Sequence, residues 1–394
     1  MQDQAWMADV FDFLFGPVTP EAFFDTYHEK KALICKREDR ERYLGLLSIE
    51  RIDEIVSDLD LEVGQLDMTR ADPPVEHSQY SFDSGKIDRG GVARQFQQGA
   101  TLILPQLHLN DPALASFCRA LESKLSCHVQ TNIYLTPPDA QGFKTHYDDH
   151  DVFVLQVSGS KSWRLYNTPV ENPFRGENFQ PGVHEAGEPV EEFVLEAGDC
   201  AYVPRGLMHD ALTHGDDASL HITVGLIVKT WADLMLEVMS QVALDTPGFR
   251  RALPPGYANP DFDRSTLEPQ FRELVAAIAQ KADLGDAMDI FTDNFIRSRP
   301  PAADGTIARF KTPKDPAQKY RLRPHLPWRF AEDGEELVII TSGGEVRFPA
   351  AAEPGLHQLL DGGIIDQASF TDLDEAGRED VISRLYAFGI AEPV

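Results

Sequence analysis

Two hydrophobic periodicities divide this chain of 394 residues near Val228. Before that point, short β-branched and aromatic runs, several of them alternating polar with apolar positions, are separated by turns rich in glycine, proline or serine. Beyond it, apolar positions recur every three or four residues. The first pattern predicts β-strands and the second predicts amphipathic helices. We expect strands at 129–136, 152–157, 161–166, 200–203 and 219–227, and helices over 231–242, 271–278 and 284–295.

The closely spaced strands indicate how the first part of the chain folds. Many short strands joined by glycine and proline turns are typical of a jelly-roll sandwich or barrel. Ser158-Gly159-Ser160 supplies turn residues between two of the runs, so we expect 152–157 and 161–166 to form an antiparallel hairpin. Residues 65–97 are polar and rich in Asp and Gly, and we expect them to be mostly loop.

Helix and linker signals flank the strands. Thr19 suits an N-cap and Pro20 the first helical position, while Asp111-Pro112 starts another helix. The segment 300–305 predicts a linker. Beyond it we expect a hairpin over 336–348, with helices near 354–361 and 373–388. A chain of this length suits two or three domains.

The most distinctive polar pattern is His146-Tyr147-Asp148, followed 61 residues after the aspartate by His209. Two imidazoles and one carboxylate occupy one face of an octahedral divalent metal and leave the other face open. Strand alternation would place His146 and Asp148 on the same side. An isolated His-x-Asp is more often a solvated loop, and His150 is a competing ligand. We favour the set with His209, because three ligands from one strand would leave the turn that leads to His209 unexplained.

Lys161 begins the strand that follows the Ser-Gly-Ser turn. If this side chain points inward, its ammonium needs an anion, because an unpaired buried charge costs roughly several kcal/mol. A cosubstrate that carries a carboxylate would supply that anion. The alternative is that the ammonium reaches water from the end of the hairpin, as most lysines do.

The balance of charge narrows the classes of partner. The chain has 36 Lys and Arg against 64 Asp and Glu, a net charge of −28. Such acidity argues against a general nucleic-acid binder and suits a basic protein or peptide, although it also serves solubility alone. Four cysteines without CxxC spacing, no leader signal and no apolar run near 18 residues lead us to expect a cytoplasmic protein that does not enter membranes.

Three motifs together resemble a known family. They are G-x5-P-x-G-x-x-H over 198–209, HYDD-x-(D/E)-x-F-x-LQ-x-x-G over 146–159, and K-x-WR-x-Y over 161–166. The stretch 97–226 and the opening 20–34 are similar to the JmjC-type ribosomal oxygenases, which are protein hydroxylases dependent on Fe(II), 2-oxoglutarate and O2. The resemblance departs at His150, where we expect a small apolar residue, and this leaves the substrate side of the pocket open.

The resemblance implies roles for particular residues and an architecture for the whole chain. His146, Asp148 and His209 would be the iron ligands, and Lys161, with Tyr134 and Asn132 beside it, would hold 2-oxoglutarate. The implied fold class is α+β: a double-stranded β-helix of the jelly-roll, cupin and JmjC type, followed by a helical dimerisation domain and a C-terminal winged-helix domain. The expected domains are 1–95, the N-terminal helical and loop part of the catalytic domain; 96–228, the jelly-roll core; 229–300, the dimerisation domain; and 306–394, the winged-helix-like domain.

The implied activity is hydroxylation of an arginine or histidine side chain in a ribosomal protein or another basic protein or peptide, by a homodimer. Acidic residues in the last domain, Asp361 and Asp366 among them, oppose direct DNA binding. Two other readings stay open. One is an oxygenase acting on a small molecule or a peptide natural product, and the other is a metal-binding cupin regulator without catalysis.

Overall fold

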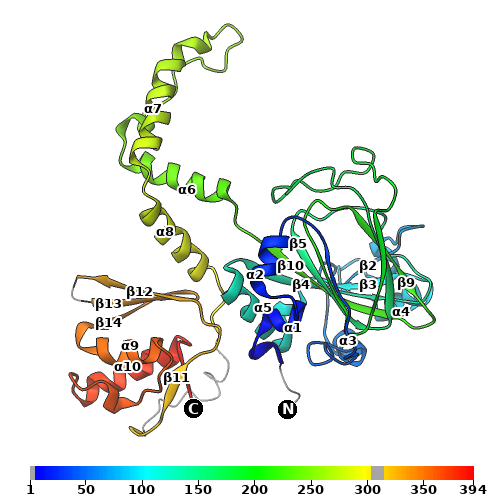
Figure 1. Cartoon of the computed structure of the whole chain (residues 1–394), viewed down its shortest axis with the longest axis horizontal. Coiled ribbons are helices and arrows are strands. Elements are labelled where there is room, and N and C mark those ends of the chain that lie inside the picture. The colour runs from blue at the N-terminus through cyan, green and yellow to red at the C-terminus, as the bar shows by residue number, and fades with distance from the viewer. Residues whose placement is uncertain (1–4, 303–314, 335) are drawn as a thin grey trace. The chain divides into compact units, whose positions relative to one another are not determined.

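The computed structural model describes residues 5–302, 315–334 and 336–394, and it divides into two compact units, 1–228 and 229–394. Of the linker expected at 300–305, residues 303–305 lie outside the described residues. Figure 1 shows the units, which we describe separately. In the described part of the chain, no helix has the length and apolarity needed to span a membrane.

Two antiparallel sheets form the centre of the first unit (Figure 1). The larger has the strand order β1-β8-β5-β10-β4-β3-β2 and the smaller the order β7-β6-β9. The strands are β1 Leu33–Cys35, β2 Asp67–Thr69, β3 Thr101–Leu104, β4 His128–Thr136, β5 Asp151–Ser158, β6 Ser160–Leu165, β7 Glu191–Glu196, β8 Cys200–Val203, β9 His209–His214 and β10 Ser219–Ile227. Val154 on β5, Trp163 on β6 and Leu195 on β7 share one apolar cluster, so the inner faces of the two sheets pack together.

Helices cover the outer face of the larger sheet (Figure 1). Phe13 and Phe117 join Ile133 and Phe153 in the main core, which lies between the helices and β4, β5 and β10. The helices of this unit are α1 Val10–Phe15, α2 Pro20–Thr26, α3 Ile49–Asp58, α4 Arg89–Gln97 and α5 Pro112–Leu125, with 3-10 turns at Ala5–Met7, His77–Gln79 and Leu107–Leu109. The expected caps are confirmed: Thr19 accepts from the Ala22 N–H, and Asp111 caps α5.

One expectation for this unit is wrong. The runs 152–157 and 161–166 form strands, but β5 and β6 do not pair as a hairpin. Both hydrogen-bonding edges of β5 are occupied by β8 and β10, so after Gly159, with φ of +63°, the chain crosses to the smaller sheet. The segment 65–97 is mostly loop, as expected, but it also contains β2, the 3-10 turn at His77–Gln79 and α4.

The second unit holds a helical module followed by a small mixed domain. Its elements are α6 Trp231–Leu244, α7 Glu268–Lys281, α8 Leu284–Arg297, β11 Tyr320–Leu322, β12 Trp328–Asp333, β13 Glu336–Thr341, β14 Gly344–Pro349, α9 Glu353–Leu360, α10 Glu375–Ala387 and β15 Ala391–Pro393, with 3-10 turns at Pro247–Arg250, Arg264–Leu267, Ala350–Ala352 and Gln367–Ser369. Helices α6 and α8 pack through Leu234, Val238 and Ala287. Strands β12, β13 and β14 form a sheet whose core includes residues of α9 and α10. The helices predicted at 231–242, 271–278 and 284–295 correspond to α6, α7 and α8, and the hairpin predicted over 336–348 corresponds to β13 and β14, so these predictions are confirmed.

Candidate functional site

The two histidines of the motif lie directly opposite each other on the backbone. His146 and His209 form an isolated antiparallel bridge, in which the His146 N–H donates to the His209 carbonyl at 3.1 Å and the His209 N–H donates to the His146 carbonyl at 2.7 Å. Opposite residues of such a pair project to the same side, and the ring centroids are 4.8 Å apart. Residues 147–150 lie outside any strand, so the strand expected at the motif is reduced to this bridge.

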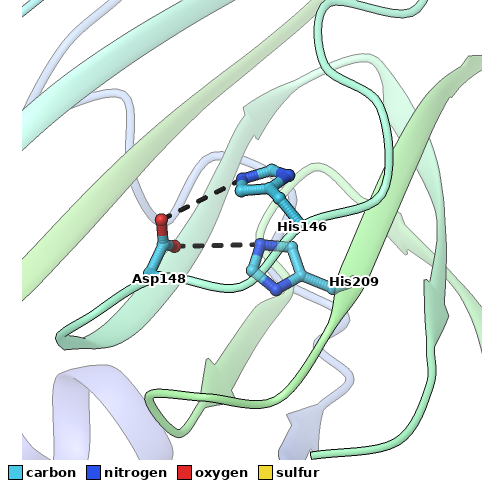
Figure 2. A group of neighbouring side chains, drawn as sticks. All are labelled: His146, Asp148 and His209. Atoms are coloured by element: carbon cyan, nitrogen blue, oxygen red, sulfur yellow. Dashed lines mark ion pairs between the residues drawn. The ribbon is translucent and has the colours of Figure 1, made fainter. Parts of the chain in front are cut away.

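Asp148 completes a cluster of three ligand-type side chains (Figure 2). Its Oδ1 lies 4.0 Å from His146 Nε2, and its Oδ2 lies 3.8 Å from His209 Nε2. Two bonds of about 2.1 Å to one divalent ion span up to about 4.2 Å, so an ion between these pairs is within reach of both atoms. All three ligand atoms lie within 4.8 Å of one another, and small side-chain rotations would close them around one ion.

Hydrogen bonds fix the tautomer of both imidazoles. Nδ1 of His146 lies 2.8 Å from the Lys144 carbonyl, and Nδ1 of His209 lies 3.0 Å from the Leu207 carbonyl. A carbonyl only accepts, so each Nδ1 carries the proton and each Nε2 presents a lone pair toward Asp148. Burial and the neighbouring His146 ring lower the pKa of His209, which also favours the neutral form that binds metal.

A buried network holds the turn that leads to His209. Gly206 has φ of +84°, and a Cβ there would collide with the Val170 carbonyl, so the turn requires glycine. Arg205 pairs with the fully buried Asp151 at 2.6 Å and also with Glu29. These contacts tie the turn to the start of β5, close to Asp148.

Both neighbours of Asp148 hold the long segment between β6 and β7. The Tyr147 hydroxyl donates to the Glu177 carbonyl at 3.1 Å, and Asp149 accepts from the Gly176 N–H at 2.7 Å. We name residues 167–190 the β6–β7 segment. It is therefore anchored on either side of the carboxylate of the cluster.

A cavity of about 260 Å³ connects the His-Asp-His cluster with Lys161. Lys161 is buried, and within the described residues its ammonium donates one hydrogen bond, to Thr136 Oγ1 at 3.1 Å. No carboxylate in that part of the chain pairs with it, and burial lowers the pKa of its ammonium to about 7. Of the two orientations considered for Lys161, the structure shows the inward one. The cavity is thus lined both by the His-Asp-His cluster and by the Lys161 ammonium, which pairs with no carboxylate of the described residues.

His221 lies beside Lys161, at a β-bulge between β10 and β5. Its ring is buried, and Nδ1 has no hydrogen-bond partner in the described structure. Burial lowers the pKa of His221 well below its usual value, and Lys161 lowers it further. The structure places His221 in the cavity wall.

The other two predicted cosubstrate residues differ in position. Tyr134 lines the cavity with its ring stacked on His221 at 4.9 Å, and burial raises the pKa of its hydroxyl. Asn132 is not among the lining residues, and its Oδ1 accepts from the Gln106 N–H at 3.1 Å. Thr136 belongs to none of the sequence motifs, yet the period-two alternation of β4 puts its side chain on the same face of the strand as that of Tyr134.

His150 does not belong to the ligand cluster. Its Nδ1 lies 3.0 Å from Asp149 Oδ1, and its ring packs against Gly225 on β10. A Cβ added at Gly225 would lie 2.7 Å from His150 Cδ2 and 2.8 Å from Nε2. The ring therefore occupies the volume that a side chain at position 225 would need.

Two facing antiparallel sheets around a His-Asp-His cluster define a cupin-like class, and comparison with known proteins agrees. Residues 104–234 match the family model described as the JmjC domain. The chain is 35% identical over 253 residues to a protein of Drosophila grimshawi named bifunctional lysine-specific demethylase and histidyl-hydroxylase NO66, covering 62% of this chain and 34% of that protein. It is 30% identical over 320 residues to human ribosomal oxygenase 1, covering 75% and 48%.

Solved structures show the same fold. The structure of YcfD, a ribosomal oxygenase from Escherichia coli in complex with cobalt and 2-oxoglutarate, superposes with a TM-score of 0.56 at 14% identity, covering 96% of this chain and 99% of that chain. The chain carries a JmjC domain and is a relative of the ribosomal oxygenases. It spans between about a third and about a half of the length of the curated relatives it matches.

Proposed function

We propose that the protein is an Fe(II)- and 2-oxoglutarate-dependent oxygenase that hydroxylates an arginine or histidine side chain of a ribosomal protein or another basic protein or peptide. One observation carries the proposal. The cavity combines a three-ligand cluster, whose Nε2 lone pairs are held toward Asp148, with a buried ammonium that lacks an anion. A dicarboxylate that binds metal through one end and the Lys161 ammonium through the other meets both requirements.

The residues present fit these groups. His146, Asp148 and His209 would hold Fe(II) on one face, and Lys161, Thr136 and Tyr134 would receive the far carboxylate of 2-oxoglutarate. Asn132, whose side chain accepts a hydrogen bond from the Gln106 N–H, would support the binding site of this far carboxylate from outside the cavity. With Fe(II), O2 and 2-oxoglutarate bound, one oxygen atom enters a C–H bond of the substrate, and the other enters 2-oxoglutarate, which loses CO2 and becomes succinate.

The chain's own contribution is positioning and exclusion of water. The Nδ1–carbonyl hydrogen bonds keep both imidazoles oriented as ligands. Lys161 fixes the cosubstrate by charge, and its affinity for an anion is strengthened because the pair forms away from water. Trp163, 5% exposed, closes the wall between Lys161 and His209. Acidity of the whole chain, at a net charge of −28, favours encounter with a basic partner.

Mass spectrometry of intact ribosomal proteins tests this function. Incubation with the enzyme, Fe(II), 2-oxoglutarate and O2 should add 16 Da to one protein, as expected for one oxygen atom. The Asp148→Ala variant should leave every mass unchanged and form no succinate. The hypothesis fails if the natural enzyme neither modifies a ribosomal protein nor turns over 2-oxoglutarate. Turnover with a small molecule or a peptide alone would instead favour the alternative substrate classes.

We also propose that the helical module α6–α8 is a homodimer interface. Trp231 is 79% exposed, and Leu236, Met235 and Phe271 are each more than half exposed. An apolar face of this kind is unusual on a monomer, and a second copy of the chain would cover it. The expected mass by light scattering is twice 44.0 kDa.

The C-terminal sheet β12–β14 with α9 and α10 has the elements of a small winged-helix domain. We propose that it contacts protein rather than DNA, because acidic residues such as Asp374, Glu375 and Asp380 lie on or beside α10. A mobility-shift experiment with duplex DNA should show no binding at physiological salt.

The cytoplasm is the compartment that we propose, since all four cysteines are free and buried.

A further inference from the structure

Asp210 is a buried carboxylate next to His209 that none of the roles above uses. It is 3% exposed and lies in the cavity wall. Its Oδ2 accepts from the Thr145 hydroxyl at 2.6 Å and from the Tyr166 hydroxyl at 2.7 Å. Its Oδ1 accepts from Arg164, through Nε and Nη2, each at 2.8 Å. Four donors around one buried carboxylate form a rigid, charge-assisted group.

The carboxylate and its donors come from three segments: β9 carries Asp210, β6 and the residue after it supply Arg164 and Tyr166, and the segment before His146 supplies Thr145. Thr145 immediately precedes His146, and Asp210 immediately follows His209. Arg164 lies on β6, which pairs with β9 and places Arg164 opposite Asp210. The Thr145–Asp210 hydrogen bond therefore adds a side-chain tie beside the two backbone hydrogen bonds of the His146–His209 bridge.

That tie matters because the other hydrogen bonds that hold the segment before His146 lie further upstream, where the carbonyls of Ala140, Gln141 and Gly142 accept from Thr213, Ala71 and Thr69. Residues 137–145 lie in no strand, and within the described structure His146 is joined to its neighbour strand only by an isolated bridge. Two imidazoles with centroids 4.8 Å apart, one of them deeply buried, gain nothing from each other in the absence of a metal. Their spacing must be imposed by the backbone and by the side chains that brace it.

We propose that Asp210 is a positioning residue that holds His146 and His209 at ligand spacing before metal binds. It is not itself a fourth ligand, since its oxygens are already engaged by donors and the ligand cluster of the described residues contains three members. The open face of the site stays available for substrates. This inference rests on the proposed function in one respect only, namely that the cluster binds a divalent metal.

Metal affinity is the readout, because it does not require turnover. Co(II) is titrated into the metal-free full-length protein without 2-oxoglutarate, and the dissociation constant and the visible absorption spectrum are recorded. We expect Asp210→Asn and Thr145→Val to weaken Co(II) binding by about 10- to 100-fold, the usual effect of losing a supporting group behind a metal ligand. Thr145→Ser, which keeps the hydroxyl, should bind nearly as the natural protein does.

Thr145→Val also separates geometry from charge, since it leaves the Asp210 carboxylate in place. The matched control is Asp199→Asn. Asp199 is equally buried and accepts from the Arg37 and Glu196 N–H groups, but it lies outside the cavity wall. This control should lose stability and keep its affinity for Co(II).

Natural affinity in folded Thr145→Val and Asp210→Asn would overturn the positioning role. If Asp210→Asn does not fold, Thr145→Val with its serine partner decides the question. Absence of Co(II) binding by the natural protein would instead remove the proposed function, so the two failures are distinguishable.

Discussion

Replacing Lys161 by methionine should stabilise the protein and abolish cosubstrate binding at the same time. The Lys161 side chain is buried, and among the described residues its ammonium hydrogen-bonds only to the Thr136 hydroxyl, so folding at neutral pH buries a poorly compensated charge. Burial lowers its pKa from 10.5 to about 7. At 1.36 kcal/mol per pH unit, this corresponds to at most about 5 kcal/mol of destabilisation below pH 7. Methionine fills a similar volume without charge.

The pH dependence gives the prediction its sign. The folded protein holds the lysine proton with a pKa of about 7, whereas the unfolded chain holds it to about 10.5. Between these values the unfolded state binds more protons, so the natural protein gains stability as pH rises. The advantage of Lys161→Met is therefore largest at pH 6 to 7 and declines toward pH 10. Packing of the methionine adds only a constant offset.

Urea unfolding at pH 6, 7, 8.5 and 10 measures this difference directly. Lys319→Met, at an exposed lysine, is the matched control and should show no such trend. In a second arm, Mn(II) with 2-oxoglutarate should raise the melting temperature of the natural protein and leave that of Lys161→Met unchanged beyond the effect of Mn(II) alone. An advantage that is the same at pH 6 and pH 10, or equal stabilisation of both proteins by 2-oxoglutarate, would refute the reasoning.

Two further predictions concern packing and assembly. Gly225→Ala should cost about 1–3 kcal/mol of stability, because its Cβ would lie 2.7 Å from the His150 ring, and adding His150→Ala should restore most of the loss; a double variant as unstable as the single one would contradict the contact. Trp231→Glu should convert the dimer to a monomer by light scattering, whereas Phe388→Glu, an exposed apolar position outside the helical module, should not; a dimer that survives Trp231→Glu would place the interface elsewhere.

Local periodicity predicted elements well where one face is buried. Strand β4 and helix α6 could both be predicted from the sequence, because alternating and 3.6-residue spacings of apolar residues indicate which face of a strand or helix is buried. Helix α4 was missed, since its sequence has two glycines and few apolar residues. It forms because Asp88 caps it and Val92 packs into the core. Tertiary contacts of this kind leave no local pattern.

Strand partners could not be predicted for a related reason. The run 152–157 carries no record of which strands will occupy its two edges, so a short turn suggested a hairpin that the fold does not make. The candidate ligands were evident because the spacing of His146 and Asp148 is local and the turn before His209 is rich in proline and glycine. Thr136 and Asp210 were not, because their roles depend on register across strands.

Because the β6–β7 segment is anchored beside Asp148, its position affects the geometry of the metal-ligand cluster. Tyr147 and Asp149, immediately before and after Asp148, each form a hydrogen bond with this segment. A ligand that displaces the segment therefore pulls on the backbone that carries the carboxylate. The metal would then act as a reporter: docking of a molecule on the segment, outside the cavity, would change the ligand field of the ion.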